Sequence, residues 1–274
     1  MHTCYAFKVA NKKTTFNFIY FIVIEIFILS LIQGITEFLP ISSSSHLIII
    51  SEFLNFSDQS LSIDVSLHIG SFIAVLAYFY KEIINFFNNK ILFLKIFIAS
   101  IPVMIVGFLL VEMGLIEKIR NLETIAWTTL IFGILLYLSD KFKLEKNIKR
   151  DFTYRSAIFI GLFQILALVP GVSRSGIAIT AARLLGFKRI DAAKLSFLVS
   201  IPILGAVSFF GTKNLILEES LNFTILNLIA VVLSFFFSLI TIKYFLKFIN
   251  KFNLNIFVYY RVLLGLILLI LSYL

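Results

Sequence analysis

Apolar residues occur along the chain in runs that are long and nearly uninterrupted. A helix needs roughly 20 consecutive apolar residues to cross a bilayer, and six runs approach this length: 65–80, 91–111, 124–140, 191–211, 222–247 and 254–274. Two further apolar stretches, 16–55 and 155–186, are broken around Pro40 and Pro170. The pattern predicts an all-α integral membrane protein in which one broken segment plus three transmembrane helices occurs twice.

A re-entrant helical hairpin returns to the side from which it enters, and three spans then place the second half in the opposite orientation. This is the inverted repeat found in many membrane proteins. We expect a single membrane domain over 1–274, with repeat 1 at about 16–140 and repeat 2 at about 155–274. Loop charges support the hairpins, because basic loops fall on one side and acidic loops on the other. The basic loops are 81–95, 140–155, 186–194 and 243–251, and the acidic ones are 56–64, 112–123 and 212–221.

The N-terminal tail, which carries Lys8, Lys12 and Lys13, lies on the wrong side in this arrangement. If the first segment crossed the membrane completely, the basic tail would lie on the same side as the basic loops, but the two halves would no longer match. We therefore favour the hairpin. The tail and the apolar run from Phe16 resemble a signal peptide. Because no small-residue cleavage site follows, we interpret the run as retained.

The composition also indicates a membrane protein rather than a soluble one. The chain is 60% hydrophobic, whereas a soluble domain is about 45–50% apolar. The net charge of +9 comes from bases in short loops, where they set topology rather than bind nucleic acid. The single cysteine, Cys4, excludes an internal disulfide and a multi-cysteine metal site. The oligomeric state stays open, a homo-oligomer included.

The first interruption, over 33–46, holds a carboxylate, four serines and a histidine in an apolar stretch. Ionisable groups at membrane depth are costly and by default functional. Gln33 and Glu37 are four residues apart and share one helix face. A nearby cation or arginine would keep Glu37 ionised, and the alternative is a buried structural ion pair or a helix end facing the cytosol.

Pro40 ends the first helix, and Ser42 or Ser43 can cap a new one whose N-terminus suits an anion. Ser43 and His46 are three residues apart, a spacing that allows their hydroxyl and imidazole to meet. A serine beside a base is the arrangement of an activated nucleophile. The alternative is simply a capped helix start.

The second interruption repeats this design. Ser173 or Ser175 can cap a helix that starts at Arg174, and Gly176 allows close backbone approach. The planar guanidinium of Arg174 matches phosphate oxygens. Arg174 could instead pair with Glu37 and lock the hairpins together, and we favour binding plus pairing.

At these residues the chain resembles the undecaprenyl-diphosphate phosphatase family of bacitracin-resistance type. The segment Gln-Gly-Ile-Thr-Glu-Phe-Leu-Pro-Ile-Ser-Ser-Ser-Ser-His over 33–46 resembles the family's Glu/Gln-x3-Glu motif and its Pro-x-Ser-Ser-x-x-His stretch. The segment Pro-Gly-Val-Ser-Arg-Ser-Gly over 170–176 resembles its Pro-Gly-x-Ser-Arg-Ser-Gly motif. The resemblance covers nearly the whole chain beyond roughly the first 16 residues.

The resemblance implies a phosphatase that converts undecaprenyl diphosphate to the monophosphate, the carrier lipid of peptidoglycan synthesis, and confers bacitracin resistance. It implies a multi-pass protein of the bacterial cytoplasmic (inner) membrane with an outward-facing site and a divalent cation, Mg²⁺ or Ca²⁺. The implied catalytic residues are Glu37 (also the metal ligand), Ser43 as nucleophile, His46 for proton transfer and Arg174 as the diphosphate clamp. The implied substrate-binding residues are Gln33, Ser42, Ser44, Ser173, Ser175 and Gly176.

Gln33 stands where the family more often has an acid, which removes one anionic metal ligand, although Mg²⁺ needs only one or two carboxylates. Whether Ser43 forms a phosphoenzyme or positions water stays open. The alternative function is a polyprenyl-phosphate transporter or flippase, because inverted repeats with broken helices are also how many transporters are built. We interpret Arg261, which follows two tyrosines, as an interfacial anchor.

Overall fold

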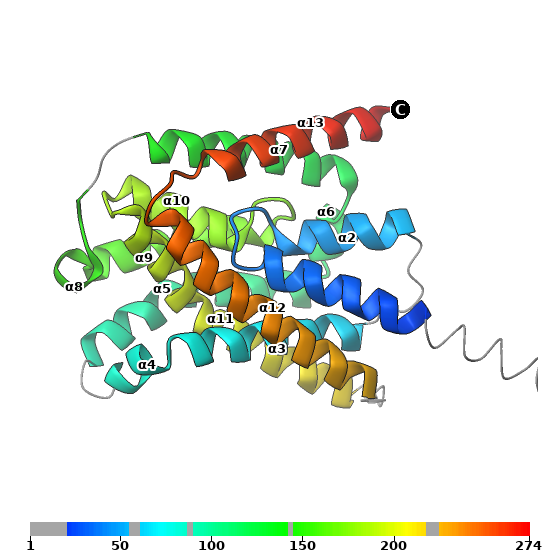
Figure 1. Cartoon of the computed structure of the whole chain (residues 1–274), viewed down its shortest axis with the longest axis horizontal. Coiled ribbons are helices and arrows are strands. Elements are labelled where there is room, and N and C mark those ends of the chain that lie inside the picture. Colours follow the sequence, from blue (N-terminus) through cyan, green and yellow to red (C-terminus); the bar gives the residue numbers. More distant parts are fainter. Residues whose placement is uncertain (1–20, 55–60, 87–89, 142–144, 218–224) are drawn as a thin grey trace, which may run out of the picture.

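The computed structural model of the chain describes residues 21–54, 61–86, 90–141, 145–217 and 225–274, and nearly all of these are helical. Six of the helices are long and apolar enough to cross a membrane (Figure 1). They are α3 (Leu61–Tyr78), α5 (Lys90–Glu112), α7 (Leu122–Asp140), α11 (Arg189–Leu217), α12 (Ile225–Ile249) and α13 (Asn255–Tyr273). Short helices α4 (Tyr80–Phe86), α6 (Ile116–Ile119) and α8 (Ile148–Asp151) lie in the connections. The predicted all-α, multi-pass architecture is confirmed.

Both broken segments fold as two short helices joined by a turn. In the first, a helix over Phe21–Thr36 is followed by α2 (Ser43–Leu54). In the second, α9 (Tyr154–Ile165) and the 3₁₀ helix η1 (Leu166–Leu168) are followed by α10 (Arg174–Leu184). Residues 16–20 of the first segment, and the N-terminal tail, lie outside the described residues.

The two turns share an unusual backbone feature. Ser42 and Ser173, each just before the second helix of its hairpin, have positive φ angles of 73° and 71°. This region is uncommon for residues other than glycine. Such strain persists only where the surrounding structure holds it, and it concentrates at functional sites.

The long helices pack in pairs, α3 against α12 and α7 against α13, while α11 contacts α3 and α10, and α5 contacts α9. Small residues bring the helix backbones close together, as is usual in membranes. At Gly70 of α3, for example, a Cβ atom would collide with the carbonyl of Val231 on α12. In Figure 1 the two hairpins enter the bundle from opposite ends and their turns overlap near its centre. The inverted relation of the halves, and the repeat boundaries within one domain, stay predictions.

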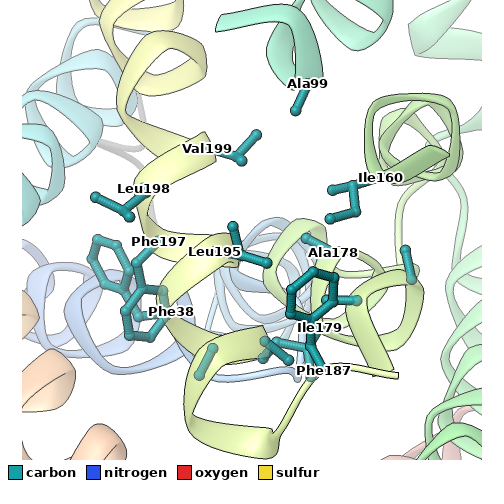
Figure 2. Close-up of a cluster of buried hydrophobic side chains, with 14 of the residues drawn as sticks. Phe38, Ala99, Ile160, Ala178, Ile179, Phe187, Leu195, Phe197, Leu198 and Val199 are labelled. Carbon is teal, nitrogen blue, oxygen red and sulfur yellow. The ribbon is translucent and has the colours of Figure 1, made fainter. Parts of the chain in front are cut away.

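The apolar core lies directly behind the turns. Phe38, fully buried, packs edge to face against Phe197 of α11, with ring centroids 5.3 Å apart (Figure 2). Ala178 and Ile179 of α10 are buried in the same cluster. Because Phe38 follows Glu37 and α10 begins at Arg174, this packing fixes the backbone that carries both ionisable side chains.

Candidate functional site

The two turns are joined by an ion pair between residues 137 positions apart. Arg174 Nη2 lies 2.6 Å from Glu37 Oε1, and the two side chains are only 14% and 5% exposed. A buried charge is costly unless it is paired and hydrogen-bonded. The pairing considered from the sequence is thus present. It uses one end of the guanidinium, while Arg174 Nη1 has no hydrogen-bond partner within the described ranges.

The other oxygen of Glu37 collects two further donors. Ser43 Oγ donates to Glu37 Oε2 at 2.5 Å, and Gln33 Nε2 donates to the same oxygen at 3.1 Å. Gln33 Nε2 also approaches Ser71 Oγ of α3 at 3.5 Å. The predicted sharing of one helix face by Gln33 and Glu37 is confirmed. The Glu37 carboxylate therefore lies beside Ser43, the candidate nucleophile. Arg174 holds one of its oxygens, and Ser43 and Gln33 hold the other.

His46 does not take the place predicted for it. Its Nδ1 donates to the Ser42 carbonyl at 2.6 Å, and its Nε2 lies 2.6 Å from Tyr260 Oη of α13. The contact between His46 and Ser43 that their spacing allows is not formed, because the Ser43 hydroxyl donates to Glu37 instead. The ring folds back on the first turn of its own helix, and with Nδ1 protonated, neutral His46 offers Nε2 to the tyrosine hydroxyl.

Tyr260 is 214 residues from His46 in the chain, and no spacing in the sequence predicts this contact. The two rings also stack, with centroids 5.7 Å apart. The imidazole is therefore fixed by a hydrogen bond at each nitrogen and by one ring face.

The remaining serines of the first tip form a small hydroxyl cluster. Ser42 Oγ lies 3.0 Å from Ser45 Oγ and 3.4 Å from Ser44 Oγ. Ser42 and Ser45 are buried, whereas Ser44 is exposed. Only Ser44 therefore presents a hydroxyl at the surface. The substrate-binding roles of Ser42 and Ser44 stay predictions.

The second tip is capped as expected and also contacts the first. Ser173 Oγ accepts a hydrogen bond from the Gly176 backbone N–H at 3.1 Å, which makes Ser173 the N-cap of α10. Ser175 Oγ donates to the Leu39 carbonyl at 2.7 Å. A Cβ atom at Gly176 would lie 3.0 Å from Arg261 Nη1, so glycine leaves room for that guanidinium. Substrate contacts by these three residues stay predictions.

Arg261 is the main site residue that sequence reasoning placed wrongly. It is 1% exposed rather than at an interface. Its guanidinium donates to three carbonyls: Nη1 to Pro40 at 3.3 Å, Nη2 to Gly171 at 2.9 Å and Nε to Thr129 at 3.2 Å. Pro40 and Gly171 belong to the two different turns. Arg261 therefore connects the two hairpin tips. It comes from the C-terminal helix α13, and only the packing of this helix brings it next to the turns.

The fold and the site define a multi-pass helical membrane protein in which two interrupted hairpins bring together a carboxylate, a hydroxyl and an arginine. The family model described as "Bacitracin resistance protein BacA" matches residues 26–267. The chain belongs to this family.

Three relatives are each named undecaprenyl-diphosphatase. The protein of Pelagibacter ubique is 51% identical over 252 residues, which cover 92% of this chain and 98% of the relative. That of Saccharophagus degradans is 43% identical over 86% of this chain and 93% of its own length. That of Jannaschia sp. is 39% identical over 90% and 98%. The resemblance drawn from the two motifs is confirmed.

Proposed function

We propose that this protein hydrolyses undecaprenyl diphosphate to undecaprenyl phosphate and inorganic phosphate. The observation that carries the proposal is the contact of Ser43 and Arg174 with the two oxygens of one buried carboxylate, Glu37. The site lies in a chain 51% identical to a relative named undecaprenyl-diphosphatase. The bond that breaks joins the terminal phosphorus to the bridging oxygen. The lipid monophosphate leaves, and the oxygen of water ends on phosphate.

Glu37 is positioned to accept the proton of the attacking group. Ser43 Oγ already donates to Glu37 Oε2, the arrangement of a nucleophile with its general base. If Ser43 attacks phosphorus, a phosphoserine forms and water then hydrolyses it. If Ser43 positions water, the water proton moves to the same carboxylate. Both routes need Glu37 ionised.

Arg174 couples substrate binding to the strength of this base. While it pairs with Glu37 it stabilises the carboxylate anion and weakens its affinity for a proton. A diphosphate bound to the Arg174 guanidinium competes with Glu37 for its positive charge. Glu37 therefore becomes a better base when substrate is present. The buried Nη1 group, which has no hydrogen-bond partner among the described residues, supplies a free donor for phosphate. The N-terminus of α10 beside it favours negative charge.

His46 and Tyr260 form a hydroxyl–imidazole pair beside the nucleophile-bearing turn. A neutral imidazole with Nδ1 protonated can take a proton at Nε2 through the tyrosine hydroxyl. We assign to His46 the transfer of protons to or from bulk solvent. We assign to Tyr260 the positioning of the imidazole ring. The direct role in the chemistry of Ser43 belongs to Glu37.

The divalent cation implied by the resemblance, Mg²⁺ or Ca²⁺, fits the donor set at the first tip. Gln33 Oε1 is a buried oxygen without a hydrogen-bond partner in the described part of the chain, next to Glu37. Mg²⁺ takes oxygen ligands and is commonly held by one or two carboxylates together with substrate phosphates and water. Glu37 and Gln33 would hold the ion, which supplies charge neutralisation on the phosphates.

We place the protein in the bacterial cytoplasmic membrane with the site opening outward. The charge of the loops supports the orientation of the chain, because Lys and Arg concentrate in the loops on one side and such loops face the cytosol. The outward opening of the site is what the family resemblance implies. In that orientation the first hairpin enters from the outer face.

Phosphate release from undecaprenyl diphosphate, or from farnesyl diphosphate, by the purified protein in detergent tests the proposal. Release should require Mg²⁺ or Ca²⁺ and fall about 100-fold or more in Ser43→Ala, as expected for removing a group that takes part in proton transfer. Ser51→Ala, on the same helix α2, is the matched control and should retain activity. A folded protein that binds the lipid but releases no phosphate would contradict hydrolysis and favour the carrier function.

A further inference from the structure

A cavity with a basic lining lies at the end of α10 away from the hairpin site. It has a volume of about 380 Å³, within the roughly 300–1,000 Å³ typical of small-molecule sites. Five basic side chains and one acid line it: Lys141, Arg183, Lys188, Arg189, Lys251 and Glu145. Arg183 is nine residues beyond Arg174 on α10, which separates the two sites by about 14 Å along the helix axis.

Two of the arginines share one buried carboxylate. Arg183 Nε lies 3.1 Å from Asp140 Oδ1, and Arg189 Nε lies 2.8 Å from the same oxygen. Asp140 Oδ2 also accepts the Leu254 backbone N–H at 3.1 Å. Asp140 and Arg183 are only 4% and 2% exposed. One carboxylate thus faces two guanidinium groups, and five basic side chains against Glu145 leave the lining of the cavity net positive.

The lysines add charge at the mouth. Lys141, Lys188 and Lys251 are exposed, and the ion pairs found among the described residues include none of them. They come from three segments that meet only in the fold: the end of α7, the turn before α11 and the residues after α12. The ammonium of Lys141 lies over the ring of Tyr137, 4.9 Å from its centroid. Like charges brought together repel, and an anion between them relieves the repulsion.

Apolar side chains also line the cavity. Ile190 and Ile249 line it together with Phe252, whose side chain is 56% exposed. The loops that form the cavity are the basic loops predicted to face the cytosol. A basic cavity of about 380 Å³ that also has apolar side chains in its lining, at that membrane surface, matches a lipid headgroup whose acyl chains run along the bundle. Basic pockets between transmembrane helices on the cytoplasmic side bind anionic headgroups in this way.

We propose that this cavity binds the phosphate headgroup of an anionic phospholipid of the surrounding membrane. The site is separate from the one that carries hydrolysis and does not depend on it. Because Arg183 and Arg174 are on the same helix, a bound headgroup also anchors the far end of the element that positions the candidate phosphate clamp.

The test is binding of phosphatidylglycerol to the intact protein in detergent, measured by native mass spectrometry against phosphatidylcholine. A lysine at the membrane surface contributes roughly a fivefold change in affinity for anionic lipid. The double variant Lys188→Ala/Lys251→Ala should therefore lose about 30-fold in phosphatidylglycerol affinity. The matched control is Lys90→Ala/Lys149→Ala, two exposed lysines that do not line the cavity, and it should bind as the wild type does.

Equal losses in both double variants would assign the attraction to the basic surface as a whole, and no loss in either would show that the cavity lysines do not hold the lipid. Either result would overturn the proposal. Inorganic phosphate provides the second arm. If millimolar phosphate displaces phosphatidylglycerol completely and itself binds in a manner lost with the cavity lysines, the site takes free phosphate and the lipid assignment is wrong. Retention of phosphatidylglycerol in millimolar phosphate supports the headgroup. A single size-exclusion peak for each variant confirms that it is folded.

Discussion

Replacing Arg261 by lysine should disconnect the two hairpin tips. The guanidinium holds the carbonyls of Pro40 and Gly171, one from each turn, together with that of Thr129. A lysine ammonium is a point charge on a flexible stem and cannot reproduce a planar fork that reaches three fixed acceptors. We expect it to keep one of the three bonds.

The cost follows from the two bonds that are lost. A hydrogen bond to a charged group contributes about 1.5–3 kcal/mol, so the loss of two amounts to roughly 3–6 kcal/mol, including buried carbonyls left without a donor. The turns that move carry Ser43 and Arg174, and a displacement of about 1 Å between reacting groups can reduce the rate about 100-fold. Stability and turnover should therefore fall together.

Two measurements check this: the thermal unfolding midpoint in detergent and phosphate release from farnesyl diphosphate. Arg155→Lys, an exposed arginine on α9, is the matched control and should change neither. An Arg261→Lys protein with the unfolding midpoint and turnover of the wild type would refute the connecting role. Lower stability with normal turnover would show that the tips keep their geometry without it.

Three further changes have definite expected outcomes. Arg174→Lys should reduce phosphate release about 100-fold or more in steady-state assays, because one ammonium cannot replace a two-pronged phosphate contact, and near-normal turnover would remove the clamp. Gly171→Ala should lower the unfolding midpoint by the equivalent of about 1–3 kcal/mol or more, since Gly171 has φ +92° and a Cβ atom there would meet the Ile125 carbonyl at 2.7 Å. Gly114→Ala is its control, with φ +62° and nothing within 4 Å, and an equal loss in both would mean that backbone strain alone is responsible. Tyr260→Phe removes the hydroxyl that meets His46, so its pH–rate profile should shift while its stability changes little; an unchanged profile would separate the tyrosine from proton transfer.

The amino-acid sequence by itself determined the architecture. Runs of about 20 apolar residues predict bilayer-spanning helices because the backbone must satisfy its own hydrogen bonds there. Pro40 and Pro170 fall in the two interruptions, where proline cannot donate to the preceding turn. Pro102 and Pro202 lie inside α5 and α11, so proline alone does not end a helix. Contacts between residues one helical turn apart could also be predicted from the sequence, as the hydrogen bond from Gln33 to Glu37 shows.

The tertiary structure decided which polar groups meet across the bundle. Spacing suggested His46 as the base beside Ser43, but the strained turn at Ser42 directs the imidazole to its own helix and to Tyr260, and leaves Glu37 beside the hydroxyl. The position of Arg261 after two tyrosines suggested an interfacial anchor. The packing of α13 against α7 instead buries it between the two turns. The basic cavity likewise joins segments that are adjacent only in the fold. A helix pattern specifies which face is apolar, whereas the partner of a polar side chain on another helix depends on how the helices pack together.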